Sequence, residues 1–475
     1  MKKKHAIIPV VVLAALLALG ACNDAGGGDS GSVDEGAATA PPADNNGGDS
    51  GGGLPVERGY QSDMEKDVVT IRGVRPMTGA NAIFEQTAFG PQYRMWADEI
   101  NQAGGLYVKS LDRLVKVDVQ IVDGGSDVTK TTQLFEQIAA SEKPDLVIAP
   151  EGTESTIACS AIAQKYDYLL LAAEGAGKEL EKRLSDNPNT YSVLNYSETQ
   201  IPALVKFFKE AGVESTYIVY TADLRGIEYV GATKSALEAI GIEMRGMESV
   251  PSEGFDPDEL VDNAMRSGAD AFLVYTGSGE SVAITKSAAR LGYNPTMYFV
   301  GPGGSFDSFG SFVFGDPANT TIDGVFSWGA WNGRSAAHNT GTGEYSDHFR
   351  RYWTEKGLFW QKADGSPNDA GSETVYQDWW GHICYYSAMQ ILQQAVENAG
   401  ELTDDGRINN LTLVEYIRDN PFDTVMHSEL RFTNNTLADD IYLGNIGQWQ
   451  NGVFEVMDCD ARRTADPWYP KPEWK

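Results

Sequence analysis

The stretch Val68-Val69-Thr70-Ile71-Arg72-Gly73-Val74 decides the fold class, because it opens a regular alternation of strand-like and helix-like segments. It is rich in β-branched residues and is punctuated by glycine, which predicts a strand. Residues 89–101 carry apolar side chains near helical spacing, and Gly104-Gly105 ends that pattern, which predicts a helix. Residues 114–122 form the next strand-like run. Together these segments predict a strand–helix–strand unit.

The same alternation continues through the middle of the chain. Further helices are predicted over residues 131–140, 156–164, 201–211, 227–240, 258–267 and 282–292. Further strands are predicted over residues 145–149, 168–172, 216–220, 243–248, 271–275 and 297–300. After these the pattern loosens, and residues 375–399 predict one long helix. A strand–helix period of roughly 25 to 40 residues indicates parallel, doubly wound sheets with helices on both faces.

Length and composition indicate two folded lobes and exclude one class of partner. The chain has 475 residues, of which 42% are apolar, so it is too long for a single small core. Its 37 Lys and Arg against 67 Asp and Glu give a formal charge of -30, which repels nucleic-acid phosphates. We therefore expect an α/β protein with two doubly wound parallel-sheet lobes, and no nucleic-acid partner.

The first residues indicate export and a lipid anchor. Three lysines precede an apolar run from Ala6 to Leu19 that is shorter than a bilayer span, so residues 1–21 are predicted to be a signal peptide. Leu19-Gly20-Ala21-Cys22 resembles a bacterial lipobox, in which cleavage leaves a lipidated Cys22 as the first residue. The alternative is an ordinary secretory signal with a chance cysteine.

A tether follows the predicted cleavage site. Residues 23–55 contain ten Gly in 33 residues and almost no apolar side chain, so nothing there offsets the entropy of folding. We assign residues 22–62 to the lipidated cysteine and this disordered segment. The cysteines beyond the anchor are Cys159, Cys384 and Cys459, which permit one disulfide in any of three pairings or buried structural thiols.

Ligands of open α/β sheets bind beyond the carboxyl ends of the strands, where loops and helix N-termini converge. The candidate site residues are therefore those that follow each predicted strand. They lie in residues 75–85, 123–127, 150–156, 173–177, 221–226, 276–280 and 301–305.

Several kinds of chemistry lack their motifs. The five histidines show no zinc spacing, so no metal site is predicted. Residues 277–281 differ from a serine-nucleophile elbow, because Gly279 stands where the serine belongs. Phe306 stands where a G-x-G-x-x-G fingerprint beginning at Gly301 needs its last glycine. We expect neither an enzyme nor a bound cofactor.

Two local sequences carry a family resemblance. Val69 to Gly79, which ends in Arg75-Pro76-Met77-Thr78-Gly79, is similar to an opening strand followed by a "P-hydrophobic-[ST]-G" loop. Ala97 to Leu106 is similar to the signature A-x-x-I-N-x-x-G-G-[IL]. The chain from about Asp67 to Val456 thereby resembles the type I periplasmic-binding-protein family, in particular the branched-chain-amino-acid-type substrate-binding lipoproteins of ABC importers. Weaker matches are Asp123, residues 386–400 and residues 447–452.

The resemblance implies two lobes joined by a multi-strand hinge, with the ligand between them. Lobe 1 would comprise residues 63–193 and 326–430, and lobe 2 residues 194–325 and 431–475. The ligand-binding positions it implies are Thr78, Phe84, Thr153, Glu174, Ala176, Arg225, Thr276, Ser278 and Gly303.

Four of these positions depart from the family pattern. Ala176 replaces a frequent threonine, and Gly303 stands where amino-acid binders often carry the acid that pairs with the ligand ammonium. Arg225 instead offers a fork for a carboxylate, and Glu174 is able to accept from an amine or amide. The alternative is that both are solvated charges at the rim. Trp328, Trp331, Trp379 and Trp380 are read either as an aromatic wall or as core packing.

These observations predict a lipid-anchored, extracytoplasmic solute-binding protein of an ABC importer, located in the periplasm or on the outer face of the cell membrane. It would capture a small amino-acid-, amide- or carboxylate-like solute and deliver it to the membrane subunits of the permease. We expect a monomer held to the membrane by its lipid. The alternative is a sensor or regulator lipoprotein of the same fold that binds a ligand or a protein.

Overall fold

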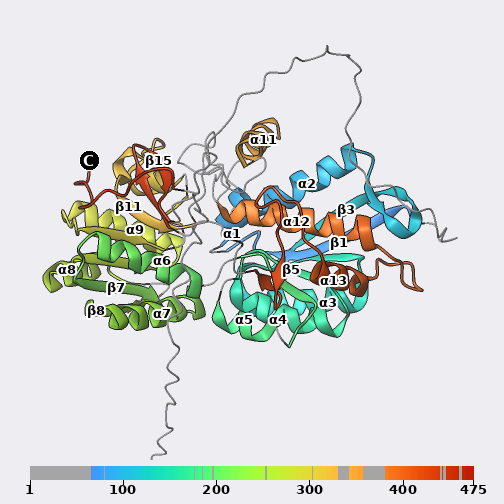
Figure 1. The fold of residues 1–475 in the computed structure, drawn as a ribbon, viewed down its shortest axis with the longest axis horizontal. Helices are drawn as coiled ribbons and strands as arrows, with labels where there is room; N and C mark the ends of the chain where they lie inside the picture. The colour runs from blue at the N-terminus through green and yellow to red at the C-terminus, as the bar shows by residue number, and fades with distance from the viewer. Residues whose placement is uncertain are drawn as a thin grey trace, which may run out of the picture. The chain divides into compact units, whose positions relative to one another are not determined.

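Two mainly parallel β-sheets organise the described part of the chain (Figure 1). The computed structural model describes residues 66–79, 81–175, 177–184, 186–194, 197–251, 254–301, 303–306, 308–329, 342–356, 380–438, 441, 446–458 and 463–475. All of them belong to one unit, Gly59–Lys475. The predicted signal peptide, Cys22 and the whole of the tether therefore lie outside the described residues.

The first sheet is four-stranded. β1 pairs in parallel with β3 along its whole length and with β4 on its other side, whereas β2 runs antiparallel to β3 at the edge. A parallel pair, β5 and β6, contacts β4. In spatial order the strands are β2 (Leu106–Val108), β3 (Arg113–Asp123), β1 (Val68–Arg75) and β4 (Leu146–Ile148), followed by β5 (Leu170–Ala172) and β6 (Thr190–Ser192).

Helices cover both faces of the four-stranded sheet (Figure 1). Alternate residues of β1 point to opposite faces, so Val69 and Ile71 join one apolar cluster and Val74 joins the other. The first cluster is completed by α2 (Gly90–Gln102), α11 (Thr342–Glu355), α12 (Trp380–Ala399) and α13 (Asn410–Asp419). The second is completed by α3 (Val128–Gln137) with the π-helical turn Ile138–Glu142, and by α4 (Gly152–Lys165).

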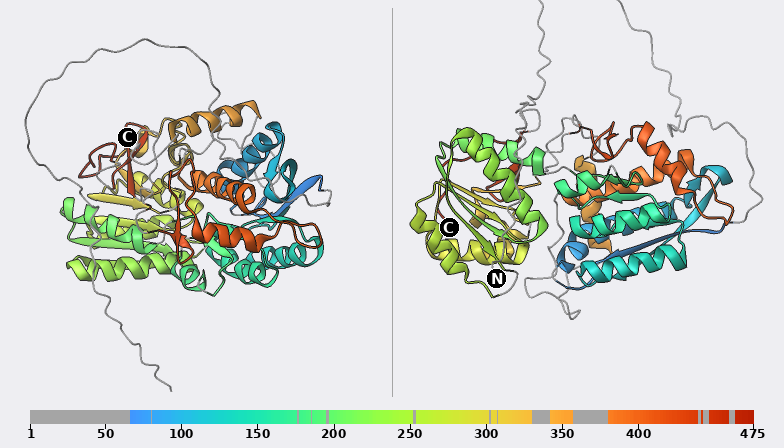
Figure 2. Two further views of the ribbon diagram at one scale, coloured as in Figure 1. Left: turned by 45° about the vertical axis from the view of Figure 1, so that its right-hand side comes forward. Right: turned by 90° about the horizontal axis from the view of Figure 1, so that it is seen from below.

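The second sheet is seven-stranded, and helices cover both of its faces as well (Figure 2, right). The five strands from β11 to β8 are parallel, and the antiparallel hairpin of β14 and β15 forms the edge beside β11. In spatial order the strands are β15 (Val453–Val456), β14 (Ile446–Gln450), β11 (Val325–Trp328), β10 (Met297–Val300), β9 (Ala271–Tyr275), β7 (Ser215–Thr221) and β8 (Glu243–Val250).

The side chains of β9 show how this sheet is sandwiched. Leu273 packs with α6 and α7, whereas Phe272 and Val274 pack with α8, α9 and α10 on the other face. The helices are α6 (Ser197–Glu210), α7 (Leu224–Ile240), α8 (Pro257–Ser267), α9 (Ser278–Arg290) and α10 (Phe309–Phe314).

The two sheets share one strand order. β1 lies between β3 and β4, and β7 lies between β8 and β9, so among the parallel strands of each sheet the first separates the second from the third. At such a point the loops after neighbouring strands diverge to opposite faces and leave a crevice at the carboxyl ends. Each sheet therefore has a natural ligand-facing end.

The predicted fold class is confirmed, and most predicted elements are present within a few residues of their expected ends. The interpretation missed short elements that carry too few residues for a periodic pattern. These are β2, β6, α1 (Ala82–Phe84), the π-helical turn Glu85–Phe89 and α5 (Lys178–Leu184). Two longer helices, α11 and α13, were also not predicted, and they lie where the alternation loosens. Of the helix expected over residues 375–399, the part before residue 380 lies outside the described residues.

Two strand assignments differ from the expected lobe boundaries. Residues 326–328 were expected in lobe 1, but β11 pairs with β10 and β14 and so belongs to the seven-stranded sheet. β12 (Phe432–Thr433) and β13 (Thr436–Leu437) were expected in lobe 2, but they contact α13 and β6 beside the four-stranded sheet. The division into lobes as a whole stays a prediction.

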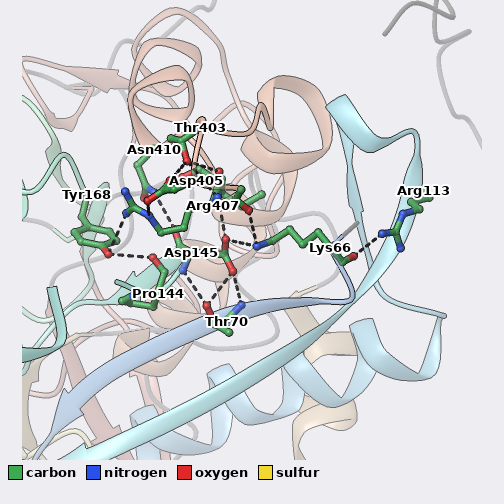
Figure 3. Close-up of polar contacts among 12 residues, drawn as sticks. Lys66, Thr70, Arg113, Pro144, Asp145, Tyr168, Thr403, Asp405, Arg407 and Asn410 are labelled. Atoms are coloured by element: carbon green, nitrogen blue, oxygen red, sulfur yellow. Dashed lines mark hydrogen bonds and ion pairs between the residues drawn. The ribbon is translucent and has the colours of Figure 1, made fainter. Parts of the chain in front are cut away.

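A buried carboxylate joins distant parts of the chain around the four-stranded sheet (Figure 3). Asp145 Oδ2 accepts from Thr70 N and Oγ1 at 2.8 and 2.9 Å. Its Oδ1 accepts from Ile408 N at 3.0 Å and pairs with Lys66 Nζ at 2.6 Å. Asn410 Nδ2 donates to the Asp145 carbonyl at 2.8 Å. Residues 66–70 and 408–410 thus meet at the start of β4.

Cys159 and Cys384 are free and buried in different apolar clusters, and Cys459 lies outside the described residues. Within the described ranges, no helix is both long and apolar enough to cross a membrane.

Candidate functional site

A cavity of about 300 Å³ lies at the carboxyl ends of the strands. Part of its lining comes from segments that follow β1, β3, β4, β5 and β6 in the first part of the fold. The rest comes from α6, from the segments that follow β7 and β10, and from β11. A volume of this size falls at the lower end of small-molecule sites. The position agrees with the expectation drawn from the strand order.

Four of the predicted ligand-binding residues line this cavity: Phe84, Thr153, Glu174 and Arg225. They come from the segments after β1, β4, β5 and β7, so the structure brings together residues that are up to 141 positions apart in the sequence, from Phe84 to Arg225.

The other predicted positions are not part of the described lining. Thr78 is exposed and donates its hydroxyl to Asp123 Oδ2 at 2.7 Å. Thr276 is buried with its hydroxyl 2.8 Å from that of Ser281. Gly303 forms a turn with a positive φ of 101°. Ser278 is the first residue of α9, and its side chain lies outside the described residues. Ala176 lies outside them entirely.

A fully buried arginine organises the acidic side of the cavity. Arg75 Nε donates to Glu85 Oε2 at 2.8 Å, and Nη1 donates to the carbonyl of Ala149 at 3.1 Å. Nη2 pairs with Glu174, and the guanidinium lies over the ring of Tyr385 at 5.2 Å. Burial tends to lower the pKa of Arg75, but the two carboxylates outweigh it and raise the pKa further above its ordinary value.

Two glutamates of the lining have raised pKa values. Burial raises the pKa of Glu174 to about 8, although Arg75 opposes the shift. Burial likewise raises the pKa of Glu151, the residue before α4, to about 7, against the opposing effects of Arg75 and Arg225. The lost hydration of each carboxylate is therefore only partly replaced by the protein.

Aromatic rings form two walls of the cavity. Phe84 and Phe306 meet edge to face with their ring centres 5.2 Å apart. Tyr229 and Trp328 stack with centres 5.3 Å apart and an interplanar angle of 24°. Trp328 thus lines the cavity, whereas the side chains of Trp331, Trp379 and Trp380 lie outside the described residues.

Two buried polar atoms of the lining lack a hydrogen-bond partner among the described residues. They are Ser305 Oγ and Trp328 Nε1, and the two residues are 1% and 3% exposed. A buried polar atom without a partner costs free energy. Neither atom is accessible from the cavity, so neither identifies a ligand contact.

The charged residues at the start of α7 are largely satisfied within the protein. Arg225 Nη2 lies 3.3 Å from Asp223 Oδ2, and the Arg225 side chain is 39% exposed. Glu228 accepts from the backbone N–H groups of Lys178 and Glu179 at 2.8 and 3.0 Å, and so caps the N-terminus of α5.

Sequence reasoning did not single out Arg75, Glu151 or Ser305, although all three fall in segments that follow predicted strands. The available signal for Arg75 was its position at the end of an apolar strand. A charged side chain is buried at such a position only when it has ion-pair or hydrogen-bond partners. Within the described ranges, no group of three or more His, Cys, Asp or Glu side chains is placed to hold a metal ion.

Comparisons with known proteins agree with this architecture. A family model described as "Periplasmic binding protein" matches residues 68–451. A branched-chain amino acid transporter substrate-binding protein from Streptococcus pneumoniae, solved with isoleucine, is similar with a TM-score of 0.66 at 13% identity, covering 82% of this chain and 98% of that one.

Two further solved structures are similar. A leucine-binding protein from Thermotoga maritima matches with a TM-score of 0.64 at 14% identity, covering 82% of this chain and 97% of that one. A solute-binding protein of an ABC transporter from Rhodopseudomonas palustris, in complex with dihydroxybenzoic acid, matches with a TM-score of 0.63 at 13% identity, covering 86% and 98%.

Proposed function

Because the chain belongs to the periplasmic-binding-protein family, we propose that it is the lipid-anchored solute-binding component of an ABC importer. Membership of this family implies a location outside the cytoplasm. The protein captures a small organic solute and hands it, chemically unchanged, to the membrane subunits of the permease. Cys22 carries the lipid, and residues 22–62 are the tether.

The observation that carries this proposal is the cavity at the strand ends, whose lining comes from segments associated with both sheets. Glu174 and Thr153 follow strands of the first part of the fold, whereas Arg225 and Trp328 belong to the segments around the seven-stranded sheet. A solute that binds residues associated with both sheets stabilises the conformation in which both groups of residues contact it at once. Its binding free energy is therefore able to shift the protein toward a closed form.

Solute binding is tested with the full chain carrying Cys22→Ser, which removes the proposed lipidation and keeps the protein soluble. Thermal unfolding is measured against amino acids, amides, amines and carboxylates. A ligand that binds only the folded state raises the melting temperature by mass action. We expect one chemical class to stabilise the protein, and a folded, ligand-free chain that no class stabilises would contradict solute binding.

The anchor is tested separately in cells. The wild-type chain should be recovered with membranes and carry acyl chains on its N-terminal cysteine by mass spectrometry, because several acyl chains give stable anchoring. Cys22→Ser should move the protein to the soluble extracytoplasmic fraction. An unacylated wild-type N-terminus would refute the anchor without bearing on solute binding.

A further inference from the structure

One side of the cavity carries more acidic groups than basic groups. Glu85, Glu151 and Glu174 are grouped around a single guanidinium, that of Arg75. Arg75 pairs with Glu85 and with Glu174, and no basic side chain among the described residues lies within ion-pair distance of Glu151. Three carboxyl groups and one guanidinium leave an excess of two negative charges when all are ionised.

The excess is concentrated on the residues that face the cavity. Glu85 is fully buried away from it and accepts from Arg75 and from the hydroxyl of Tyr93. Glu151 and Glu174 both line the cavity. Paired charges in a low-dielectric site are stable only when the charges balance, so the cavity is suited to a cation.

A carboxylate ligand has no cation free to receive it on this side. The guanidinium of Arg75 is already occupied by two carboxylates and a backbone carbonyl. Arg225 is the remaining basic residue of the lining, and it is partly exposed and paired with Asp223. An entering carboxylate would therefore add a charge of the same sign beside Glu151 and Glu174.

Aromatic rings also line the cavity. The walls formed by Phe84, Phe306 and Tyr229 are suited to an apolar or aromatic body and attract a cation placed over a ring face.

We propose that the cavity binds a small organic amine in its cationic form, with the ammonium received by Glu151 and Glu174 and its apolar or aromatic body against the rings of Phe84, Phe306 and Tyr229. This inference rests on the proposed solute-binding function and names its substrate class.

The test uses three probes with the same hydroxyphenyl body and different heads: tyramine is a cation, phloretamide is neutral and phloretate is an anion. Leucine is added as a zwitterion. Binding to the full chain with Cys22→Ser is measured by isothermal titration calorimetry. We expect tyramine to bind most tightly and phloretate not to bind.

Variants locate the ammonium. Glu151→Gln and Glu174→Gln should each weaken tyramine binding by about tenfold or more, because each replaces a charged acceptor by a neutral one. Glu136→Gln is the matched control. Glu136 lies on α3, forms a partly exposed ion pair with Lys165 and does not line the cavity. It should leave tyramine affinity unchanged.

The outcomes separate the two proposals. Binding of phloretate or leucine without tyramine would overturn the cationic class and leave solute binding intact. Tyramine binding that both glutamine variants retain would overturn the assignment of the ammonium to Glu151 and Glu174. Silence of a folded, ligand-free chain toward all four probes would overturn the amine class, and silence toward the broader solute panel as well would overturn solute binding.

Discussion

Replacement of Arg75 by methionine tests whether the buried cluster beside the cavity is a balanced set of charges. Arg75 is fully buried and is the shared partner of Glu85 and Glu174. Arg75→Met keeps the length and much of the apolar stem but removes the cation, leaving two carboxyl groups in an apolar setting. Breaking a buried ion pair on one side costs about 3 to 5 kcal/mol. We expect a loss of that size in the free energy of unfolding at neutral pH.

The measurement is urea unfolding at pH 7.5, followed by tryptophan fluorescence. The free energies of unfolding are compared between variants whose dependence on urea concentration, the m value, is the same. The triple variant Arg75→Met/Glu85→Gln/Glu174→Gln should recover more than half of the loss, because it removes the stranded charges together with their partner. Arg266→Met is the control. Arg266 forms an exposed i,i+4 pair with Asp262, so its loss should change stability by about 0.5 kcal/mol or less.

The reasoning fails in either of two cases. In the first case, Arg75→Met lowers the free energy of unfolding by less than about 1 kcal/mol. So small a loss would contradict the cost of leaving two buried carboxyl groups without their cation. The other is a triple variant that is no more stable than the single one, which would mean that Arg75 acts by packing alone.

The remaining predictions concern pH, the buried carboxylate and two glycines. The pKa values of Glu151 and Glu174 are raised from 4.5 to about 7 and about 8, so the folded state holds protons that the unfolded state releases, and the free energy of unfolding should fall as pH rises from about 4.5 to 8. Each glutamate contributes at most about 1.4 kcal/mol per pH unit to this fall. Urea unfolding at several pH values should show a steeper fall for the wild type than for Glu151→Gln/Glu174→Gln, and equal falls would argue against the shifts. Asp145→Asn should cost about 1.5 to 3 kcal/mol in urea unfolding, because it replaces a charged acceptor of four contacts, whereas the exposed Asp466→Asn should cost less than about 0.5. Gly226→Ala should lower the melting temperature because its Cβ would overlap the backbone of the preceding strand, while Gly231→Ala in the same helix meets nothing within 4 Å and should stabilise by about 0.5 to 1 kcal/mol; equal effects of the two would contradict the packing.

Long, periodic segments of the fold were predictable from the sequence. The strand predicted over residues 297–300 is β10 itself, and the helix over residues 258–267 differs from α8 by one residue. Asn451-Gly452 supplied a hairpin turn between β14 and β15, and both residues have the positive φ that such a turn requires. The family resemblance was carried by local motifs and is confirmed by the match over residues 68–451.

Short elements were not predictable, and the reason is physical. β6 has three residues and the π-helical turn at Glu85 has five, so neither spans enough positions to show a period. Their conformation is decided by tertiary partners: β6 pairs with β5, and Glu85 is held by Arg75.

The candidate site was predictable only in its location. The strand-end rule selected the segments that contain Glu151, Glu174 and Arg225, all of which line the cavity. The rule says nothing about which side chain of a loop turns inward. Thr78 and Thr276 lie in equally favoured segments, yet their hydroxyls are engaged by Asp123 and Ser281.

The meeting of distant segments at Asp145 has a consequence for the order of folding. Lys66 and Thr70 reach it from the start of the described chain, whereas Ile408 and Asn410 reach it after more than 330 intervening residues. The hairpin of β14 and β15 completes the other sheet from residues 446–456. All four strands of the first sheet lie within residues 68–148, but the helices α12 and α13, which complete one of its apolar clusters, lie within residues 380–419. Contacts this far apart in sequence form slowly. We therefore expect that neither half completes its packing until most of the chain has been synthesised.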